Sequence, residues 1–148
     1  MRVLEMVGGM LETVVRALAK SDLFGALSIE QLRKIAQRGE LLQCADGATL
    51  LAAGDPSEGF FVVLSGEVVV RSGEHELGRL GPSDLVGEMG VLLRTERSAS
   101  VHAEGPALVL KFDAAVFDAM FERVPGFGLG VSRALARRLE TTNRKVAL

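Results

Sequence analysis

The stretch GEMGVLLRTERSAS, residues 87–100, carries the residue types that can hold a small anion. Glu88 and Arg97 lie nine positions apart, beside two glycines and two serines. Arginine supplies a fixed charge and a fork of donors that match phosphate oxygens. A short helix over EMGVLL begins with N–H groups that lack partners inside the helix, and such groups also suit an anion. Gly87 allows a tight turn and a close approach of backbone to ligand.

The other side chains of this stretch extend the interpretation to a sugar phosphate. Ser98 adds a hydroxyl group. A phosphate repels Glu88, but a sugar hydroxyl can donate a hydrogen bond to its carboxylate. Each of these residues also has a purely structural explanation. For Glu88, an acid in the first turn of a helix is stabilising by itself. Arg97 could pair with Glu88 or Glu96 at the surface, and composition does not choose between Arg97 and Arg94.

Length and composition limit the class of protein. With 148 residues, 48% of them hydrophobic, the chain fits one folded domain rather than a disordered segment. A net charge of −2 gives no general attraction for nucleic acid. The single cysteine, Cys44, excludes an internal disulfide and fits a reducing compartment. Glu5 and Glu12 interrupt the apolar N-terminus, and no apolar run is long enough for a membrane span. We therefore expect a cytoplasmic location and no membrane partner.

The first part of the chain, residues 1–39, has a helical pattern. Apolar residues recur at helical spacing at Val3, Leu4, Val7, Leu11, Val14, Val15 and Leu18. Ser21-Asp22 interrupts this pattern. Ser28 to Gln31 matches a capping box that starts a second helix, and we expect Gly39 to stop it. Both helices are predicted to pack on a core or on a partner.

Residues 40–113 have short apolar runs separated by turn signals. These signals are Gly54-Asp55-Pro56, Ser65-Gly66, Ser72-Gly73 and Gly81-Pro82. In FFVVLSGEVVVRSG, two runs rich in β-branched residues flank the turn signal Ser65-Gly66. The pattern predicts an antiparallel sandwich or small barrel.

Residues 114–148 return to a helical pattern. Asp113 can cap the helix AAVFDAMFERV. Pro125-Gly126 then breaks the chain before a long final helix. A short heptad-like seam on that helix comprises Ser132, Leu135, Leu139, Thr142 and Val146. This seam either packs back on the barrel or pairs with another copy of the chain.

Taken whole, GEMGVLLRTERSASVHA resembles the phosphate-binding cassette of cyclic nucleotide-binding domains. The family pattern is met by Gly87, Glu88, Met89, Gly90, Val91, Arg97, Ser98, Ala99, Val101 and Ala103. Upstream, LLAAGDPSEGFFVVLSGEVVV resembles strands of the same family, with Phe61 in place of the usual tyrosine. The resemblance covers about residues 22–146 and implies a mainly β fold with flanking helices. That fold is an antiparallel β-roll or jelly roll (a double-stranded β-helix) with N-terminal helices and two C-terminal helices.

The resemblance also implies a ligand, cyclic AMP or cyclic GMP, and a role for each site residue. Arg97 matches the arginine that binds the exocyclic phosphate oxygens, which selects it over Arg94. Glu88 matches the glutamate that binds the ribose 2′-hydroxyl. The rest of the phosphate cradle is implied to be Gly87, Met89, Gly90, Ser98 and Ala99. The apolar side chains implied to contact the base are Val70, Leu77 and Val86. Because the chain has no Trp or Tyr, the strongest stacking residues are missing.

The segment ARRLETTNRKV, residues 136–146, resembles the dimer helix of the catabolite activator protein family. Thr142 and Asn143 match small polar residues that meet the adenine amino group, although hydroxyl and amide groups can serve either base. Thr142 is equally explained as a residue of the seam. Arg138 matches an arginine that approaches the cassette. The resemblance therefore implies a homodimer through this helix and a preference for cyclic AMP over cyclic GMP.

We accordingly divide the chain into an N-terminal helical extension, residues 1–20, and a cyclic nucleotide-binding domain, residues 21–148. The barrel is expected at about 40–113 and the C-terminal helices at about 114–146. The transcription regulators of this family continue into a helix-turn-helix. This sequence ends two residues past Val146, so we expect no DNA binding from it. It is either a stand-alone sensor or the effector part of a longer regulator.

The function implied is a non-enzymatic receptor whose last helix moves when a cyclic nucleotide binds, with no metal or further cofactor. A cupin-like metal enzyme is an alternative, but it needs clustered ligands and the chain has only His75 and His102. Cys44 has no histidine near it in sequence to activate a thiol nucleophile. A domain that kept the fold and lost its ligand is the third possibility. The presence of both Arg97 and Glu88 argues against it.

Overall fold

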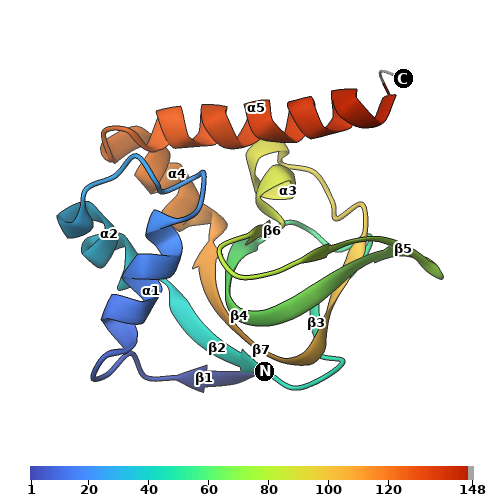
Figure 1. Ribbon diagram of the computed structural model, residues 1–148, viewed down its shortest axis with the longest axis horizontal. Helices are drawn as coiled ribbons and strands as arrows, with labels where there is room; N and C mark the ends of the chain where they lie inside the picture. Colours follow the sequence, from blue (N-terminus) through green and yellow to red (C-terminus); the bar gives the residue numbers. More distant parts are fainter. Residues whose placement is uncertain (147–148) are drawn as a thin grey trace.

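A computed structural model describes the backbone of residues 1–146 and the side chains of residues 1–141. The elements are β1 (Arg2–Leu4), α1 (Met10–Ala19), α2 (Ile29–Ala36), β2 (Glu40–Cys44), β3 (Thr49–Leu51), β4 (Gly59–Ser72), β5 (His75–Leu80), β6 (Leu85–Val86), α3 (Glu88–Leu93), β7 (Ser100–Asp113), α4 (Ala114–Arg123) and α5 (Phe127–Val146). The strands form a curved antiparallel roll (Figure 1). Helices α1, α2 and α4 gather at one end of the roll, and α5 crosses above α3. The predicted fold class, a β-roll with flanking helices, is confirmed.

The first residues form a strand, so the helix predicted to include Val3 and Val7 is wrong at its start. Arg2–Leu4 pairs antiparallel with β2, with Val3 opposite Leu42. Gly8 has a φ of 61°, which ends the extended segment before α1 begins at Met10. The apolar spacing suits a helix, but the open edge of β2 supplies backbone hydrogen bonds that this segment uses instead.

The second helix begins as the sequence predicts. Ser28 Oγ accepts the Gln31 N–H at 3.1 Å, and Gln31 Oε1 accepts the Ser28 N–H at 2.9 Å. This reciprocal pair is a complete capping box. Helix α2 ends at Ala36, three residues before the predicted stop at Gly39. Gly39 instead lies against the Leu110 side chain, where an added Cβ would come within 2.7 Å.

The sheet has the order β1-β2-β7-β4-β5, and β3 and β6 pair with β7 and β4. The turn predicted at Ser65-Gly66 is wrong, because β4 runs without a break through this position. The register of β4 with β7 shifts on both sides of Ser65, which marks β-bulges. Gly66 has a φ of 85°, and an added Cβ would lie 2.5 Å from the Pro106 carbonyl oxygen. The glycine thus bends one long strand instead of ending it.

Alternate residues of β4 enter two different hydrophobic cores, as the two-residue period of a strand requires. Phe60 and Val62 pack with the helices, whereas Phe61 and Val63 lie inside the roll. The helical core contains a cluster of phenylalanine rings with centroid separations of 5.3 to 6.5 Å. Its members are Phe24, Phe60, Phe112, Phe117 and Phe127. This cluster fixes the helical layer, including the first turn of α5, to the end of the roll.

The C-terminal helices lie where the sequence predicts them. Asp113 is the N-cap residue of α4, but its side chain accepts no capping hydrogen bond. The chain breaks at Pro125-Gly126, and α5 begins at Phe127. An added Cβ at Gly130 would lie 1.9 Å from the Leu23 carbonyl oxygen. The first turns of α5 therefore pack directly on the backbone that joins α1 to α2.

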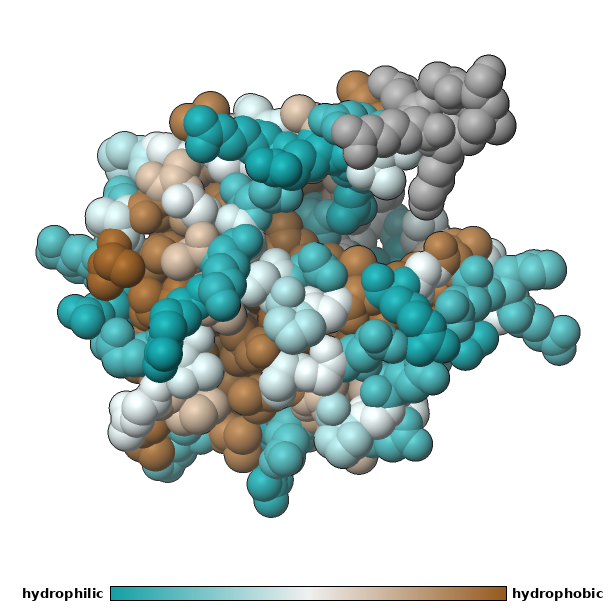
Figure 2. Space-filling model, in the orientation of Figure 1, coloured by the Kyte–Doolittle hydropathy of each residue, from teal (hydrophilic) through white to brown (hydrophobic). Residues whose placement is uncertain are grey.

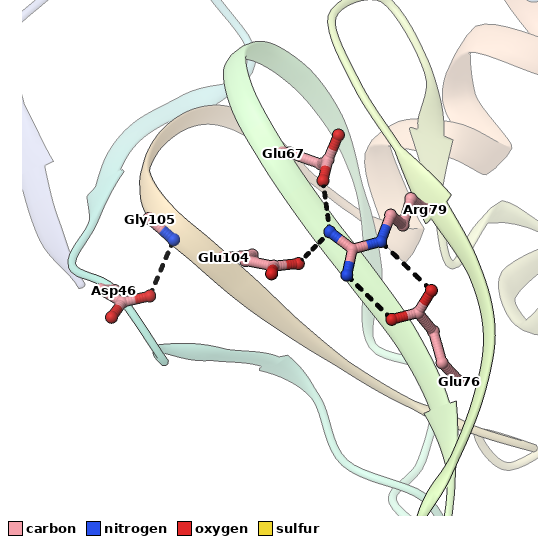
Figure 3. Close-up of polar contacts among 6 residues, drawn as sticks. All are labelled: Asp46, Glu67, Glu76, Arg79, Glu104 and Gly105. Atoms are coloured by element: carbon pink, nitrogen blue, oxygen red, sulfur yellow. Dashed lines mark hydrogen bonds and ion pairs between the residues drawn. The ribbon is translucent and has the colours of Figure 1, made fainter.

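An ionic cluster on the outer face of the roll joins three strands (Figure 3). Glu67 of β4 lies directly opposite Glu104 of β7, an arrangement that is repulsive by itself. Arg79 of β5 donates Nη1–H to both carboxylates, at 2.7 Å for Glu67. It also holds Glu76 through two hydrogen bonds, of 2.9 and 3.1 Å. Hydrogen bonds and charge from Arg79 lower the pKa of Glu76 below its ordinary value. The cluster ties the edge strand β5 to the rest of the sheet.

Candidate functional site

The site begins at a left-handed glycine between β6 and α3. Gly87 has a φ of 84° and is the N-cap residue of α3. An added Cβ there would lie 2.7 Å from Arg97 Nη1 and 3.0 Å from Leu51 Cδ1. Glycine is therefore required both by the backbone angle and by the close approach of the arginine. The structure thus brings together Gly87 and Arg97, which the sequence motif assigns to one site.

Arg97 is buried, with 8% of its surface exposed. Its Nη1 donates to the Gly87 carbonyl at 2.6 Å, and its Nη2 donates to the Gly59 carbonyl. It forms no ion pair with any carboxylate of the part of the chain that the structure describes. Burial lowers the pKa of Arg97, and the nearby charge of Glu88 acts in the opposite direction. Arginine still stays protonated, so the site contains a buried positive charge that has no ion pair among the described residues.

Arg94, the rival candidate in the sequence, lies elsewhere. It ends α3 in a left-handed conformation with a φ of 57°, and its side chain is exposed. It is absent from the lining of the cavity that contains Arg97. Geometry therefore separates two arginines that composition did not.

Glu88 is also buried, with 8% of its surface exposed. Its Oε1 forms an ion pair with Arg138, which projects from α5. Its Oε2 is buried and has no hydrogen-bond partner among the described residues. A buried oxygen without a donor is costly, by about 1–3 kcal/mol. Such an oxygen can accept a hydrogen bond from a ligand hydroxyl.

Most of the predicted residues line one cavity of about 460 Å³ beside α3. They are Val70, Val86, Gly87, Met89, Gly90, Arg97, Ser98, Ala99 and Arg138. The same cavity has further lining residues that the sequence analysis missed, namely Leu51, Leu80, Leu85, Leu93, Thr95, Glu96 and Val101. Three of these leucines, Leu51, Leu80 and Leu85, lie in strands. An apolar strand residue that faces a cavity looks the same in sequence as one that packs in a core, so the sequence carries no signal for them.

An adjoining cavity of about 540 Å³ lies between β5 and α5. Two of the predicted site residues, Leu77 and Glu88, line this second cavity and not the first. Val70, Leu80, Leu85 and Arg138 line both cavities. Figure 2 shows the surface hollowed below α5, between this helix and the roll. Thr142 and Asn143 lie on α5, but their side chains are outside the described residues.

Cavity size alone does not identify the site. A third cavity, of about 470 Å³, lies at the other end of the roll between β1 and the α2–β2 connection. Its lining side chains include Arg38, Glu40, Lys111 and Asp113, of which none is buried. The cavity beside α3 differs because it contains the buried charge of Arg97. We therefore place the candidate site there.

A metal site or a reactive thiol has little support among the described residues. No three His, Cys, Asp or Glu side chains of this part of the chain are grouped closely enough to bind a metal ion. Cys44 lies inside the roll core, where burial raises the pKa of its thiol. His102 Nδ1 contacts Thr49 Oγ1 at 3.1 Å, on the β3–β7 pair. Within residues 1–146, no helix combines the length and the apolar character needed to span a membrane.

The fold and the site define a class of structure: a β-roll in which a short helix and a buried arginine line a cavity. A sequence model of the cyclic nucleotide-binding domain matches residues 41–124, which is more than half of the chain. The chain therefore belongs to the cyclic nucleotide-binding domain family. This confirms the resemblance on which the sequence analysis depended.

Known proteins that resemble this chain include an effector protein, a catabolite activator protein and a regulatory domain. The Pycsar effector protein PaPycTIR of Pseudomonas aeruginosa is 33% identical over 115 residues, which are 77% of this chain and 37% of that protein. The structure of Thermus thermophilus catabolite activator protein is similar with a TM-score of 0.77 and 28% identity, over 86% of this chain and 62% of that one. The regulatory domain of Toxoplasma gondii PKA, solved with cAMP, has a TM-score of 0.72 and 26% identity, over 78% and 46%. The chain spans 37% of the length of PaPycTIR and 46% of the length of the Toxoplasma gondii chain.

Proposed function

We propose that this domain is a non-enzymatic receptor for a 3′,5′-cyclic nucleotide. One observation carries the proposal: the buried guanidinium of Arg97, which has no ion pair among the described residues, lies in the same region as the buried, unpaired Oε2 of Glu88. A cyclic nucleotide supplies one anionic phosphate and one free ribose hydroxyl, which is one partner for each group. Membership of the family supports the same ligand class.

The proposal assigns roles to residues of both adjoining cavities. Arg97 binds the exocyclic phosphate oxygens, and Ser98 with the main chain at Met89 and Gly90 completes the phosphate contacts. Glu88 accepts the ribose 2′-hydroxyl. Val70 and Val86 contact the base from the roll. Leu77 belongs to the adjoining cavity and contacts the base only if the ligand extends below α5.

We further propose that binding changes the position of α5. The ion pair of Arg138 with Glu88 joins α5 to the site, so a ligand hydroxyl that approaches Glu88 competes with Arg138. The first turns of α5 are fixed by the buried Phe127 and by Gly130 against Leu23. Residues 136–141 carry exposed side chains, and we propose that the helix shifts from this part onward. This difference supports a motion about the middle of the helix.

The preferred ligand is proposed to be cyclic AMP rather than cyclic GMP. The proposal depends on Thr142 and Asn143 of the α5 sequence, because a hydroxyl or an amide oxygen can accept a hydrogen bond from the adenine amino group. Discrimination by one such bond is of order 1 kcal/mol, or several-fold to tenfold in affinity. The structure of a relative with bound cAMP supports this choice.

A second candidate function concerns a longer protein. The similar structures include the N-terminal domain of a Streptomyces coelicolor transcriptional regulator, with 29% identity and a TM-score of 0.72 over 88% of this chain. That likeness supports an effector domain that controls a separate output domain. The homodimer through α5 and a cytoplasmic location remain predictions of the same account.

Calorimetric titration of the purified chain with the four common 3′,5′-cyclic nucleotides tests the proposal. All four share the phosphate and ribose, so each is expected to bind, and cyclic AMP is expected to bind most tightly. A Thr142→Ala, Asn143→Ala double variant is expected to bind cyclic AMP and cyclic GMP with nearly equal affinity. Absence of binding by all four ligands would overturn the receptor function. A double variant that kept the full preference would place selectivity in the roll instead.

A further inference from the structure

We propose that Ser57, in the connection between β3 and β4, is a positioning residue for Arg97. The inference rests on the proposed cyclic nucleotide site and adds to it a residue that does not touch the ligand. Ser57 is absent from the lining of the cavity that contains Arg97. Its effect on binding must therefore pass through its neighbours.

The Ser57 side chain joins the two segments that surround Arg97. Its Oγ donates to the Thr95 carbonyl at 2.6 Å, and the Thr95 N–H donates to the Gly90 carbonyl at 3.1 Å. An added Cβ at Gly90 would lie 2.2 Å from Ser57 Oγ and 3.1 Å from Arg97 Nη1. Ser57 is thus wedged against α3, close to the guanidinium, and bonded to the turn that leads into Arg97.

The same connection also holds the main chain of Arg97. The Gly54 N–H donates to the Arg97 carbonyl at 2.9 Å, and the Arg97 N–H donates to the Asp55 carbonyl at 2.8 Å. At the end of the connection, the Gly59 carbonyl accepts a hydrogen bond from Arg97 Nη2. The connection between β3 and β4 therefore holds Arg97 at its main chain and at its guanidinium.

Ser57 differs from these neighbours in the kind of contact that it makes. Gly54, Asp55 and Gly59 act through main-chain atoms, which almost any residue supplies. Ser57 acts through a hydroxyl, which a substitution can remove without changing the backbone. Without it, the Thr95 carbonyl loses its donor and the turn before Arg97 gains freedom. A phosphate contact needs donors held at hydrogen-bond distance, so this freedom weakens binding.

The first test compares cyclic AMP affinity for the wild type and for Ser57→Ala by calorimetry. We expect Ser57→Ala to bind about three- to tenfold more weakly, the effect of one neutral hydrogen bond. Ser65→Ala is the matched control, because Ser65 is exposed on β4 and does not line the cavity. In an Arg97→Lys background, Ser57→Ala is expected to have almost no further effect, because the fork that it positions is gone. An equal loss in both backgrounds would show a general structural role and would overturn the inference.

The second test needs no ligand, so it separates this inference from the proposed function. Amide hydrogen exchange at Arg97, whose N–H is bonded to Asp55, is expected to be faster in Ser57→Ala than in the wild type and in Ser65→Ala. Global unfolding by urea is expected to change little. If the wild type binds no cyclic nucleotide, the proposed function fails while the exchange comparison still decides the role of Ser57. Unchanged exchange at Arg97 would overturn that role.

Discussion

Arg138, on α5, forms an ion pair with Glu88, at the first turn of α3. Half of the Arg138 side chain is exposed, whereas only 11% of the Glu88 side chain is. The pair links α5 to α3, which lies beneath it (Figure 1). It gives the protein a direct connection between the state of Glu88 and the position of α5.

Removal of Arg138 is expected to loosen α5. In Arg138→Ala, the Glu88 carboxylate loses its cation and stays mostly buried, which destabilises the fold by about 1–3 kcal/mol. Hydrogen exchange should become faster in the turns of α5 that follow Ala134. The double variant Arg138→Ala, Glu88→Gln should recover part of the lost stability, because no buried charge remains. If the double variant were less stable than Arg138→Ala, the ion pair would not be the link between these elements.

Two glycines of α5 provide a matched pair of substitutions. In Gly130→Ala the added Cβ would lie 1.9 Å from the Leu23 carbonyl oxygen, so the helix must move away and the protein should lose at least about 2 kcal/mol of stability. In Gly128→Ala the nearest atom, Phe121 Cζ, is 4.0 Å away. This variant should be neutral or gain up to about 1 kcal/mol from helix propensity. Urea unfolding measures both, and similar values for the two variants would contradict the packing of α5 on Leu23.

Acid is expected to weaken the attachment of β5. The pKa of Glu76 is lowered by Arg79, so the folded protein binds this proton less readily than the unfolded chain. The contribution of the Glu76–Arg79 interaction to stability is therefore complete above the ordinary pKa of 4.5, and it is lost as the pH falls below that value. Arg79→Gln should lose part of the acid dependence of stability, although it leaves Glu67 opposite Glu104. Melting temperatures from pH 6 to pH 3 measure this, with Arg94→Gln, at an exposed arginine outside this cluster, as the control. An unchanged slope in Arg79→Gln would contradict it.

The seam on α5 predicts a dimer. Leu139 is 61% exposed, which suits contact with a second copy. Leu135 packs partly on the helical core, so only part of the predicted seam faces outward. Light scattering at micromolar concentration should show a dimer for the wild type and a smaller mass for Leu139→Asp. A wild type that stays monomeric with and without cyclic AMP would overturn the prediction.

The sequence predicts the local features of this protein better than it predicts their three-dimensional relations. The capping box at Ser28 and the break at Pro125-Gly126 depend on neighbouring residues, so their patterns are reliable. The strand at Arg2–Leu4 is determined by the open edge of β2, which lies about forty residues away in sequence. The bulge at Gly66 depends on the close approach of Pro106. Neither distant partner is visible in a local pattern.

The same distinction holds for the site. The motif from Gly87 to Ala99 is one continuous segment, and the structure places most of it around one cavity, with Glu88 at the adjoining one. Leu77 was assigned by analogy along β5, and the bulge between Val70 and Arg71 helps to place it in the adjoining cavity. Ser57 and the Gly59 carbonyl hold Arg97 from another connection. Hydrogen bonds to main-chain atoms leave no pattern in sequence, so these supports could not be predicted.

The central claim is that Arg97 binds the phosphate of a cyclic nucleotide. The most direct measurement is calorimetric titration of the wild type, Arg97→Ala and Arg94→Ala with cyclic AMP, with circular dichroism to verify that each variant is folded. A charge-assisted hydrogen bond contributes about 1.5–3 kcal/mol, so Arg97→Ala should bind roughly ten- to over a hundredfold more weakly. Arg94→Ala, whose side chain is exposed outside the cavity, should bind like the wild type. Equal losses in the two folded variants, or none in Arg97→Ala, would contradict the account.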